Sequence, residues 1–323
     1  MVIKLGRRLM RAFVCSLIII LAGCSEYSED PLRIGIHVWP GYDTLILARE
    51  KGYIGDPNVK LIELPSASES IRAMQNHTID GALLTIDEVL RLAENGHEPR
   101  IILIMDFSNG ADAVLGRPEI SELADLKGKS IGVEPNALGA YMLARALAAA
   151  NLKPADVKLV SMPISEMELA YQDGRVDAVV TYEPHRTRIM EKGARILFDS
   201  TRIPGEITDV LVVRKDVIDR SPKAIQSLVD AQFEALKYLS QHPKKAAAIM
   251  APRENVTSAQ FLDSLQRLVL PDRATNQKLL SSSDQTIPQT IRGLVAVMRS
   301  NKILKSDPSG LEYRDDRFVR GPD

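Results

Sequence analysis

A repeat with a spacing of 97 residues is the feature that most constrains how this chain folds. Adding 97 to the numbering takes Ile34-Gly35-Ile36 onto Ile131-Gly132-Val133, and Asp80 onto Asp177. The strand-like runs after the two aspartates are also similar, since Gly-Ala-Leu-Leu-Thr85 corresponds to Ala-Val-Val-Thr181. Further matches are Ser68-Glu69 with Ser165-Glu166, Ala73 with Ala170, and Gln75 with Gln172. Two lobes with the same βαβ order would produce this register, and a chance likeness between ordinary βα units is the alternative.

Short β-like runs alternate with longer helical patterns from Leu32 onward, which predicts an α/β fold with mainly parallel sheets flanked by helices. The strands are expected at residues 33–38, 59–64, 80–84, 101–105, 111–115, 130–133, 157–161, 177–181, 196–198 and 208–213. After Asp216 the pattern becomes helical over residues 222–241 and 289–301, and Thr257 with Gln260 fits a capping box. We expect this last third to cover a sheet face.

The N-terminal residues have the features of an exported leader. Four basic residues precede an apolar stretch over residues 12–21, which is too short to cross a bilayer core that needs about 20 residues. Leu21-Ala22-Gly23-Cys24 resembles the lipobox of bacterial lipoprotein precursors. The pattern predicts a signal peptide over residues 1–24, a lipid on Cys24, a polar tether over 25–31, and a periplasmic protein anchored to the lipid bilayer. A plain secretory peptide that ends near a cysteine is the alternative.

Composition excludes several classes of function. Cys15 and Cys24 are the only cysteines, so the chain has no internal disulfide once the leader is removed. The formal net charge is −1, and removal of residues 1–24 takes away four basic residues and no acidic one, so nucleic acid is not an expected partner. The five histidines lack metal-ligand spacing, and no phosphate loop or nucleophile elbow is present. We expect neither a metal nor a cofactor.

Four loops are expected to converge on one cleft, because ligands of open α/β sheets bind beyond the carboxyl ends of the strands. These loops are residues 39–42, 85–87, 136–139 and 182–184. In the first of them, Trp39 and Tyr42 could stack on a planar or cationic ligand. The alternatives are that Trp39 packs between the lobes and that the Tyr42 hydroxyl holds the loop. Thr85 and Asp87 are the candidates in the second loop.

The other two loops offer different chemistry. Asn136 and Ala137 lie where a helix begins, so free backbone amides could receive an oxygen or an anionic group, although Asn136 could also be a plain N-cap. Tyr182 and Glu183 end a strand. A buried Glu183 needs either a cationic ligand group or an internal arginine.

Residues 106–112 join two strand-like runs and contain Asn109-Gly110, so this segment is a candidate hinge between the lobes. Ser108 and Asn109 in this segment are further candidates for contact with the ligand.

Several motifs resemble one family of transport proteins. The stretches Trp39-Pro-Gly-Tyr-Asp43 and Ala48-Arg-Glu-Lys-Gly-Tyr53 resemble the opening of solute-binding proteins of the nitrate, sulfonate, taurine and thiamine-precursor group, which serve ABC transporters. The later stretches 125–133, 174–178 and 181–184 agree in order. The resemblance implies a type II periplasmic-binding fold with two chain crossings, in which residues 32–112 with 206–323 form one lobe and residues 113–205 the other. It also implies a ligand held at the hinge.

The charges near the predicted cleft bear on the ligand. Six acids lie near predicted strand ends: Asp87, Asp106, Asp112, Glu134, Glu183 and Asp209. Before Pro184, His37 is the only potentially basic group counted with the four loops. An oxyanion such as nitrate or an alkanesulfonate is best matched by arginine or lysine, although backbone amides can also bind anions. The charges therefore favour an amine-bearing or nitrogen-heterocyclic ligand.

Three functions remain open at the level of sequence. The first is a monomeric binding protein that captures a small molecule and docks on an ABC permease, without catalysis. The second is a sensory lipoprotein that docks on a membrane sensor kinase or cyclase. The third is an enzyme that forms the thiamine pyrimidine, but the family's cysteine cluster has no counterpart after Cys24.

Overall fold

The computed structural model describes residues 30–134 and 137–320. The predicted signal peptide, the lipidation of Cys24, all but the last two residues of the tether, and Asn136 lie outside the described residues. The following description concerns the compact unit formed by residues 31–323. None of the helices in the described ranges is both long enough and apolar enough to span a membrane.

The first sheet contains six strands in the order β11-β4-β10-β3-β1-β2. Their bounds are β1 (Leu32–Ile36), β2 (Val59–Glu63), β3 (Gly81–Thr85), β4 (Pro99–Ser108), β10 (Thr208–Arg214) and β11 (Leu268–Val269). Every residue of β3 and β10 is buried, as expected for central strands covered on both faces. β1 pairs in parallel with β2 and β3, and β10 is inserted antiparallel between β3 and β4.

The second sheet contains five strands in the order β7-β6-β8-β5-β9. Their bounds are β5 (Asp112–Gly116), β6 (Ser130–Val133), β7 (Lys158–Ser161), β8 (Ala178–Tyr182) and β9 (Arg195–Asp199). Again one antiparallel strand, β5, lies between strands that point the same way. The sheets are therefore mixed, and most strands of each share one direction.

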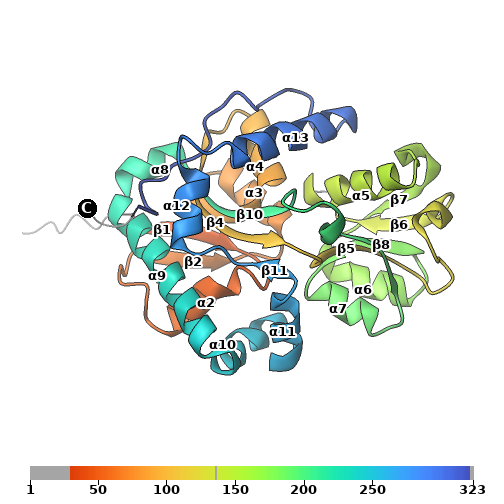
Figure 1. The fold of residues 1–323 in the computed structure, drawn as a ribbon, viewed down its shortest axis with the longest axis horizontal. Helices are drawn as coiled ribbons and strands as arrows, with labels where there is room; N and C mark the ends of the chain where they lie inside the picture. The colour runs from red at the N-terminus through yellow and green to blue at the C-terminus, as the bar shows by residue number, and fades with distance from the viewer. Residues whose placement is uncertain (1–29, 135–136, 321–323) are drawn as a thin grey trace, which may run out of the picture. The chain divides into compact units, whose positions relative to one another are not determined.

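Helices flank both sheets (Figure 1). They are α2 (Asp43–Glu50), α3 (Ala67–Gln75), α4 (Ile86–Glu94), α5 (Ala137–Ala149), α6 (Ile164–Gln172), α7 (His185–Met190), α8 (Lys215–Arg220), α9 (Pro222–Gln241), α10 (Pro243–Met250), α11 (Ser258–Leu265), α12 (Arg273–Leu280) and α13 (Thr286–Ser300). In Figure 1, α5 lies on one side of the second sheet, and α6 and α7 lie on the other. The last third of the chain is mainly helical, and Thr257 with Gln260 forms the predicted capping box at α11.

The structure corrects some predicted bounds. β4 extends to Ser108, so Asp106 and Ser108 lie inside a strand rather than after it. Asp87 lies in the first turn of α4 instead of a loop. The short strand β11 was not predicted, because two residues carry no period that the sequence could reveal. Helix α13 begins three residues before the predicted start at Gln289.

The 97-residue register is present in the strand pairing. β3 pairs with β10 through five residue pairs, from Thr85 with Asp209 to Gly81 with Val213. β8 pairs with β5 through five corresponding pairs, from Tyr182 with Asp112 to Ala178 with Gly116. The residues of β8 lie 97 positions after those of β3, whereas their partners in β5 lie 97 positions before those in β10. The parallel pairs Ile34 with Gly81 and Ile131 with Ala178 are shifted by 97 at both residues. The repeat found in the sequence is therefore structural.

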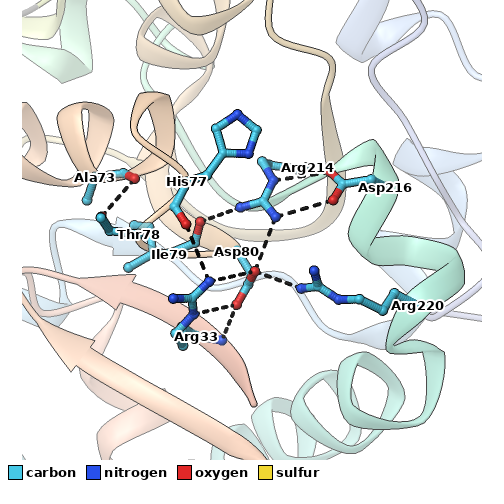
Figure 2. Close-up of polar contacts among 9 residues, drawn as sticks. All are labelled: Arg33, Ala73, His77, Thr78, Ile79, Asp80, Arg214, Asp216 and Arg220. Carbon is cyan, nitrogen blue, oxygen red and sulfur yellow. Dashed lines mark hydrogen bonds and ion pairs between the residues drawn. The ribbon is translucent and has the colours of Figure 1, made fainter. Parts of the chain in front are cut away.

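The repeated aspartates have the same backbone role. Asp80 Oδ2 accepts a hydrogen bond from the backbone N–H of Arg33 at 2.9 Å, and Asp177 Oδ2 accepts one from the backbone N–H of Ser130 at 2.7 Å. In the first sheet, Figure 2 shows the Asp80 carboxylate surrounded by the guanidinium groups of Arg33, Arg214 and Arg220. Burial alone would raise the pKa of Asp80, but hydrogen bonds from Arg33 and Arg220 lower it to about 2.

The chain passes between the two sheets twice. Residues 109–111 join β4 to β5, and residues 200–207 join β9 to β10. The predicted lobe boundaries, with one lobe of residues 32–112 and 206–323 and the other of 113–205, are supported by this division of strands and stay a proposal.

Candidate functional site

A pocket lies between the carboxyl ends of the two sheets. Its lining consists of His37, Trp39, Tyr42, Ala67, Thr85, Glu88, Asp112, Leu138, Tyr182 and Asp209. Four of these residues, Trp39, Tyr42, Thr85 and Tyr182, were predicted to contact the ligand. The cavity volume is about 10 Å³, which is about the space that one water molecule occupies.

The turn at Trp39 builds one wall of the pocket. Gly41 is required there, because a Cβ at this position would lie 1.9 Å from Asp106 Oδ2. The close approach lets Trp39 Nε1 donate a hydrogen bond to Asp106 Oδ2 at 3.0 Å. The Tyr42 hydroxyl donates to Asp209 Oδ1. Both aromatic side chains are therefore fixed by carboxylates rather than by packing alone.

Aromatic rings surround the same space. Tyr182 of β8 packs edge-on against Trp39, with ring centroids 5.9 Å apart, so the two sheets meet at this contact. Tyr42 packs edge-on against both Trp39 and His37. Ring faces of this kind attract cations, through the negative potential of the π-system.

Asp106 and Asp209 form a like-charged pair across two strands. They are directly paired in β4 and β10, an arrangement that is unfavourable unless something compensates the charge. Both carboxyls are buried, and Asp106 Oδ1 and Asp209 Oδ2 have no hydrogen-bond partner among the described residues. Burial raises the pKa of both groups, and for Asp209 the neighbouring charge of Asp106 raises it further.

Asp112 and Glu88 are two further buried carboxyls, and they line the pocket together with Asp209, whereas Asp106 lies behind the lining. Burial raises the pKa of Asp112 to about 7. The pKa of Glu88 is raised well above its usual value, first by burial and then by the charge of Asp87. The pocket therefore resists the accumulation of negative charge and would be stabilised by a cation.

No arginine or lysine lines this pocket in the part of the chain that the structure describes. Burial, together with nearby Arg253, lowers the pKa of His37 to about 3, so His37 is neutral at physiological pH. The guanidinium of Arg253 is itself paired with Asp43 and Glu63. His37, the basic residue that was counted with the predicted loops, therefore carries no positive charge in the pocket.

Four of the six predicted acids lie outside the lining: Asp87, Asp106, Glu134 and Glu183. Glu183 is fully buried, and it accepts hydrogen bonds from Arg186 Nη1 at 3.2 Å and from the backbone N–H of Thr187 at 3.1 Å. An internal arginine therefore satisfies Glu183, which was the alternative to a ligand amine. Asp87 is buried in α4 but is not part of the lining, and burial raises its pKa to about 6. Contact of Glu183 or Asp87 with ligand stays a prediction.

The hinge residues also lie outside the lining. Ser108 Oγ and Ser200 Oγ are 2.7 Å apart, and the backbone N–H of Gly110 donates to Ser200 Oγ at 2.7 Å. The backbone N–H of Asn109 donates to the carbonyl of Arg267. The bond from Gly110 to Ser200 ties the two chain crossings together, and the bond from Asn109 ties the first crossing to the segment after α11. Ala137 is the first residue of α5.

Sequence reasoning missed three lining residues: Ala67, Glu88 and Leu138. Glu88 had a usable signal, because Thr85-x-x-Glu88 is the spacing of a capping box, and Glu88 Oε2 accepts from the backbone N–H of Thr85 at 3.1 Å. Ala67 and Leu138 carry no chemical signal of their own.

The arrangement is suited to binding. Among the described residues, no group of three or more His, Cys, Asp or Glu side chains has a geometry that could hold a metal ion. The carboxyls of Glu88, Asp112 and Asp209 and the aromatic rings of Trp39, Tyr42 and Tyr182 surround a small space that can enclose a single cationic group.

Comparison with known proteins gives a family and a fold. A model of the NMT1-like family matches residues 26–252. The taurine-binding periplasmic protein of Escherichia coli (strain K12) is 24% identical over 208 residues, which are 64% of this chain and 64% of that protein. The chain thus spans less than two thirds of the length of this relative.

Solved structures confirm the predicted two-lobe periplasmic-binding fold. The alkanesulfonate-binding protein SsuA from Xanthomonas axonopodis pv. citri, bound to MOPS, matches with a TM-score of 0.75 and 18% identity, covering 88% of this chain and 99% of that one. The desulfurization enzyme DSZB matches with a TM-score of 0.64 and 19% identity, covering 90% and 98%. Binding proteins and an enzyme share the fold, so function has to be argued from the pocket.

Proposed function

Because this chain belongs to the NMT1-like family, we propose that it is a periplasmic solute-binding protein that captures a ligand with a cationic nitrogen for an ABC-type importer. The observation that carries the proposal is the lining of the pocket, which combines buried carboxyls with aromatic rings and includes no arginine or lysine among the described residues. A cation would compensate the like charges that raise the pKa of Asp209, whereas an oxyanion would add to them.

The size of the pocket favours a primary ammonium group. A space for about one water admits an –NH₃⁺ group, which has a similar volume and can donate three hydrogen bonds. The unpartnered oxygens of the lining residues Asp112 and Asp209 are suitable acceptors. A nitrogen heterocycle is larger and would require the lobes to move apart.

The names of the relatives refer to sulfonates or taurine, whereas we propose that this chain recognises a cationic nitrogen group. Taurine carries an ammonium as well as a sulfonate, so a shared ancestry is compatible with recognition of the nitrogen. For this chain the charge of the lining supports the amine, and we propose no sulfonate contact.

The sequence supports two further parts of the proposal. The lipobox at Cys24 favours a lipid anchor, which keeps the protein near an importer in the membrane. The two chain crossings, at residues 109–111 and 200–207, favour closure of the two sheets around the ligand.

Ligand pairs that differ only in the charged group test the proposal. The processed protein, purified in detergent, is titrated with ethylamine, ethanesulfonate and taurine, and binding is followed by calorimetry and by the shift in melting temperature. We expect ethylamine to bind and raise the melting temperature, and ethanesulfonate to have no effect. Binding of ethanesulfonate without ethylamine would contradict the proposed ligand class, and taurine reports whether a distal sulfonate is tolerated.

A further inference from the structure

We infer that Glu254 couples closure of the two lobes to the uptake of a proton. Glu254 belongs to the proposed first lobe and ends the short 3₁₀ turn η4 (Ala251–Glu254), which follows α10. Its side chain is buried, and among the described residues no donor reaches either oxygen of its carboxyl. A buried carboxylate without donors is costly, which favours a proton on this group. The inference assumes the lobe movement of the proposed function, but not the proposed ligand class.

Asp43 at the start of α2 forms a buried acid pair with Glu254. The two carboxyls lie within hydrogen-bond reach of each other. Two ionised carboxylates cannot hydrogen-bond, because neither carries a donor, so the pair is satisfied only when it holds one proton. Arg253 Nη1 donates to Asp43 Oδ1, which favours the ionised form of Asp43. Glu254 is therefore the member of the pair that holds the proton.

The charges around Glu254 come from both lobes. The pKa of Glu254 is raised well above its usual value, first by burial and then by the charge of Asp43. Arg253 lowers it, and Glu183 of the proposed second lobe raises it further. Helices α10 and α11 also pack against η4, and their charged residues are exposed: Lys244, Lys245 and Asp263. The acids nearest to Glu254 thus include one that lies across the boundary between the lobes.

Two polar contacts place Glu254 at this boundary. Arg188 Nη1 of α7 donates to the backbone carbonyl of Glu254 at 3.0 Å. Arg267, which follows α11, has its Nη1 at 3.7 Å from Glu183 Oε1. The guanidinium of Arg188 is also paired with Glu168 of its own lobe. Separation of the lobes would break both contacts and expose Glu254 to water.

The closed arrangement should therefore be favoured as the pH falls. When the lobes are closed, burial and the charge of Glu183 both raise the pKa of Glu254, and an open arrangement removes both effects. The closed protein thus holds more protons, and this advantage is lost as the pH rises through the raised pKa. For each proton taken up, the ratio of closed to open protein changes by up to about tenfold per pH unit.

Distance measurements between the lobes test the inference without a ligand. Spin labels are attached to Gln172→Cys in α6 and Gln241→Cys in α9, since both positions are exposed and lie in different lobes. With the proposed lipid on Cys24, these cysteines carry the only free thiols of the processed protein. Pulsed electron paramagnetic resonance in detergent, from pH 5 to pH 9, gives the distance distribution. We expect the population with the short distance to decrease as the pH rises.

Glu254→Gln isolates the contribution of this carboxyl. The amide is neutral at every pH and can donate to Asp43, so the variant should keep more of the short distance at pH 9. Its closed-to-open ratio should change less with pH, by up to about tenfold per pH unit. Glu191→Gln is the matched control, because Glu191 is exposed at the same boundary, where it accepts a hydrogen bond from Gln260 Nε2 at 2.7 Å. The control should keep the pH dependence of the unmodified protein, and melting temperatures verify that both variants fold.

The outcomes separate this inference from the proposed ligand class, because binding of ethylamine is measured on the same labelled protein. If ethylamine binds but the distances are the same at every pH, the proposed function stands and the inference is overturned. An equal pH dependence in Glu254→Gln and Glu191→Gln also overturns it, since other acids would then take up the proton. If only Glu254→Gln loses the pH dependence and no amine binds, the inference stands and the proposed ligand class is wrong.

Discussion

The two repeats share a backbone but differ in the side chains that surround it. At the start of the third strand of each repeat, Asp80 and Asp177 accept the same backbone hydrogen bond, from Arg33 and Ser130. Asp80 is fully buried among three arginines, whereas Asp177 is only partly buried and is held by the Ser130 hydroxyl. The feature that the two repeats share is the hydrogen bond between the aspartate carboxylate and the backbone N–H of the neighbouring strand. The other partners of the two aspartates differ.

At the other end of the same strands, the repeats converge on one site. Thr85 pairs with Asp209, and the equivalent Tyr182 pairs with Asp112. All four residues line the pocket. Equivalent positions in the two halves thus supply one acid each, so the repeat itself explains why the pocket is acidic from both sides.

The largest effect is expected when the two repeated aspartates are exchanged for asparagine. Asp80→Asn should lower the free energy of unfolding by about 3 kcal/mol, because it removes the buried carboxylate that the buried guanidinium of Arg214 and the half-exposed guanidinium of Arg220 share. Asp177→Asn should cost about 1 kcal/mol, since it weakens hydrogen bonds only. Urea denaturation measures both values. Equal losses would mean that the arginines around Asp80 add nothing to the shared backbone contact.

The pocket acids should differ in their effect on ligand affinity. Asp112→Asn should weaken binding of ethylamine about 30-fold or more, because truncating one partner of a buried charge pair costs at least about 2 kcal/mol. Asp209→Asn should cost less, since its neighbour Asp106 then ionises more readily and replaces the lost charge. Calorimetric titration measures the ethylamine affinity of both variants. A larger loss of affinity in Asp209→Asn than in Asp112→Asn would contradict this expectation.

The two ends of the repeated strands should respond to pH in opposite ways. The pKa of Asp112 rises from 3.8 to about 7 on folding, so the folded state binds more protons and loses about 2 kcal/mol of stability between pH 5 and pH 7. The pKa of Asp80 falls to about 2, so its contribution is present above about pH 4 and is lost as the pH falls through 2. The summed contribution of these two groups is largest near pH 4.

Urea denaturation at pH 3, 5 and 7 measures this profile. Asp112→Asn should remove the contribution of about 2 kcal/mol that Asp112 makes to the change between pH 5 and pH 7, whereas Asp177→Asn is the control that keeps it. If Asp112→Asn showed the same change between pH 5 and pH 7 as the unmodified protein, Asp112 would not contribute to the pH dependence of stability.

The sequence predicts the repeat well because strands and their periodicity are local properties. Asp106 and Asp209 were both recognised as acids near strand ends, and Trp39 and Tyr182 as aromatic candidates. That Asp106 receives the Trp39 indole N–H depends on the approach of Gly41 to β4, which no local pattern encodes. Contacts between distant strands therefore set which acid holds which ring.

The sequence could not predict which of two neighbouring side chains faces the pocket. Glu88 lines the pocket and Asp87 does not, because the phase of α4 turns one toward the cleft and the other away. Ser108 was a ligand candidate, but its hydroxyl meets Ser200 from the second crossing, 92 residues later in the chain. These choices depend on tertiary contacts, so adjacent residues of similar chemistry could not be separated from the sequence alone.

The smallest losses of unfolding free energy are expected for Ser130→Ala and Arg33→Ala. Ser130 and Arg33 occupy equivalent positions in the two repeats. Ser130→Ala removes a hydroxyl that donates to Asp177 Oδ2 at 2.6 Å and accepts from the backbone N–H of Asp177 at 3.1 Å, so it should cost about 1 kcal/mol. Arg33→Ala removes a half-exposed guanidinium, while Arg214 and Arg220 still hold Asp80, so it should cost about 0.5 kcal/mol or less. Urea denaturation of both variants measures the difference. The hydroxyl should thus matter more than the ion pair, and a greater loss for Arg33→Ala would mean that the three arginines act as one unit around Asp80.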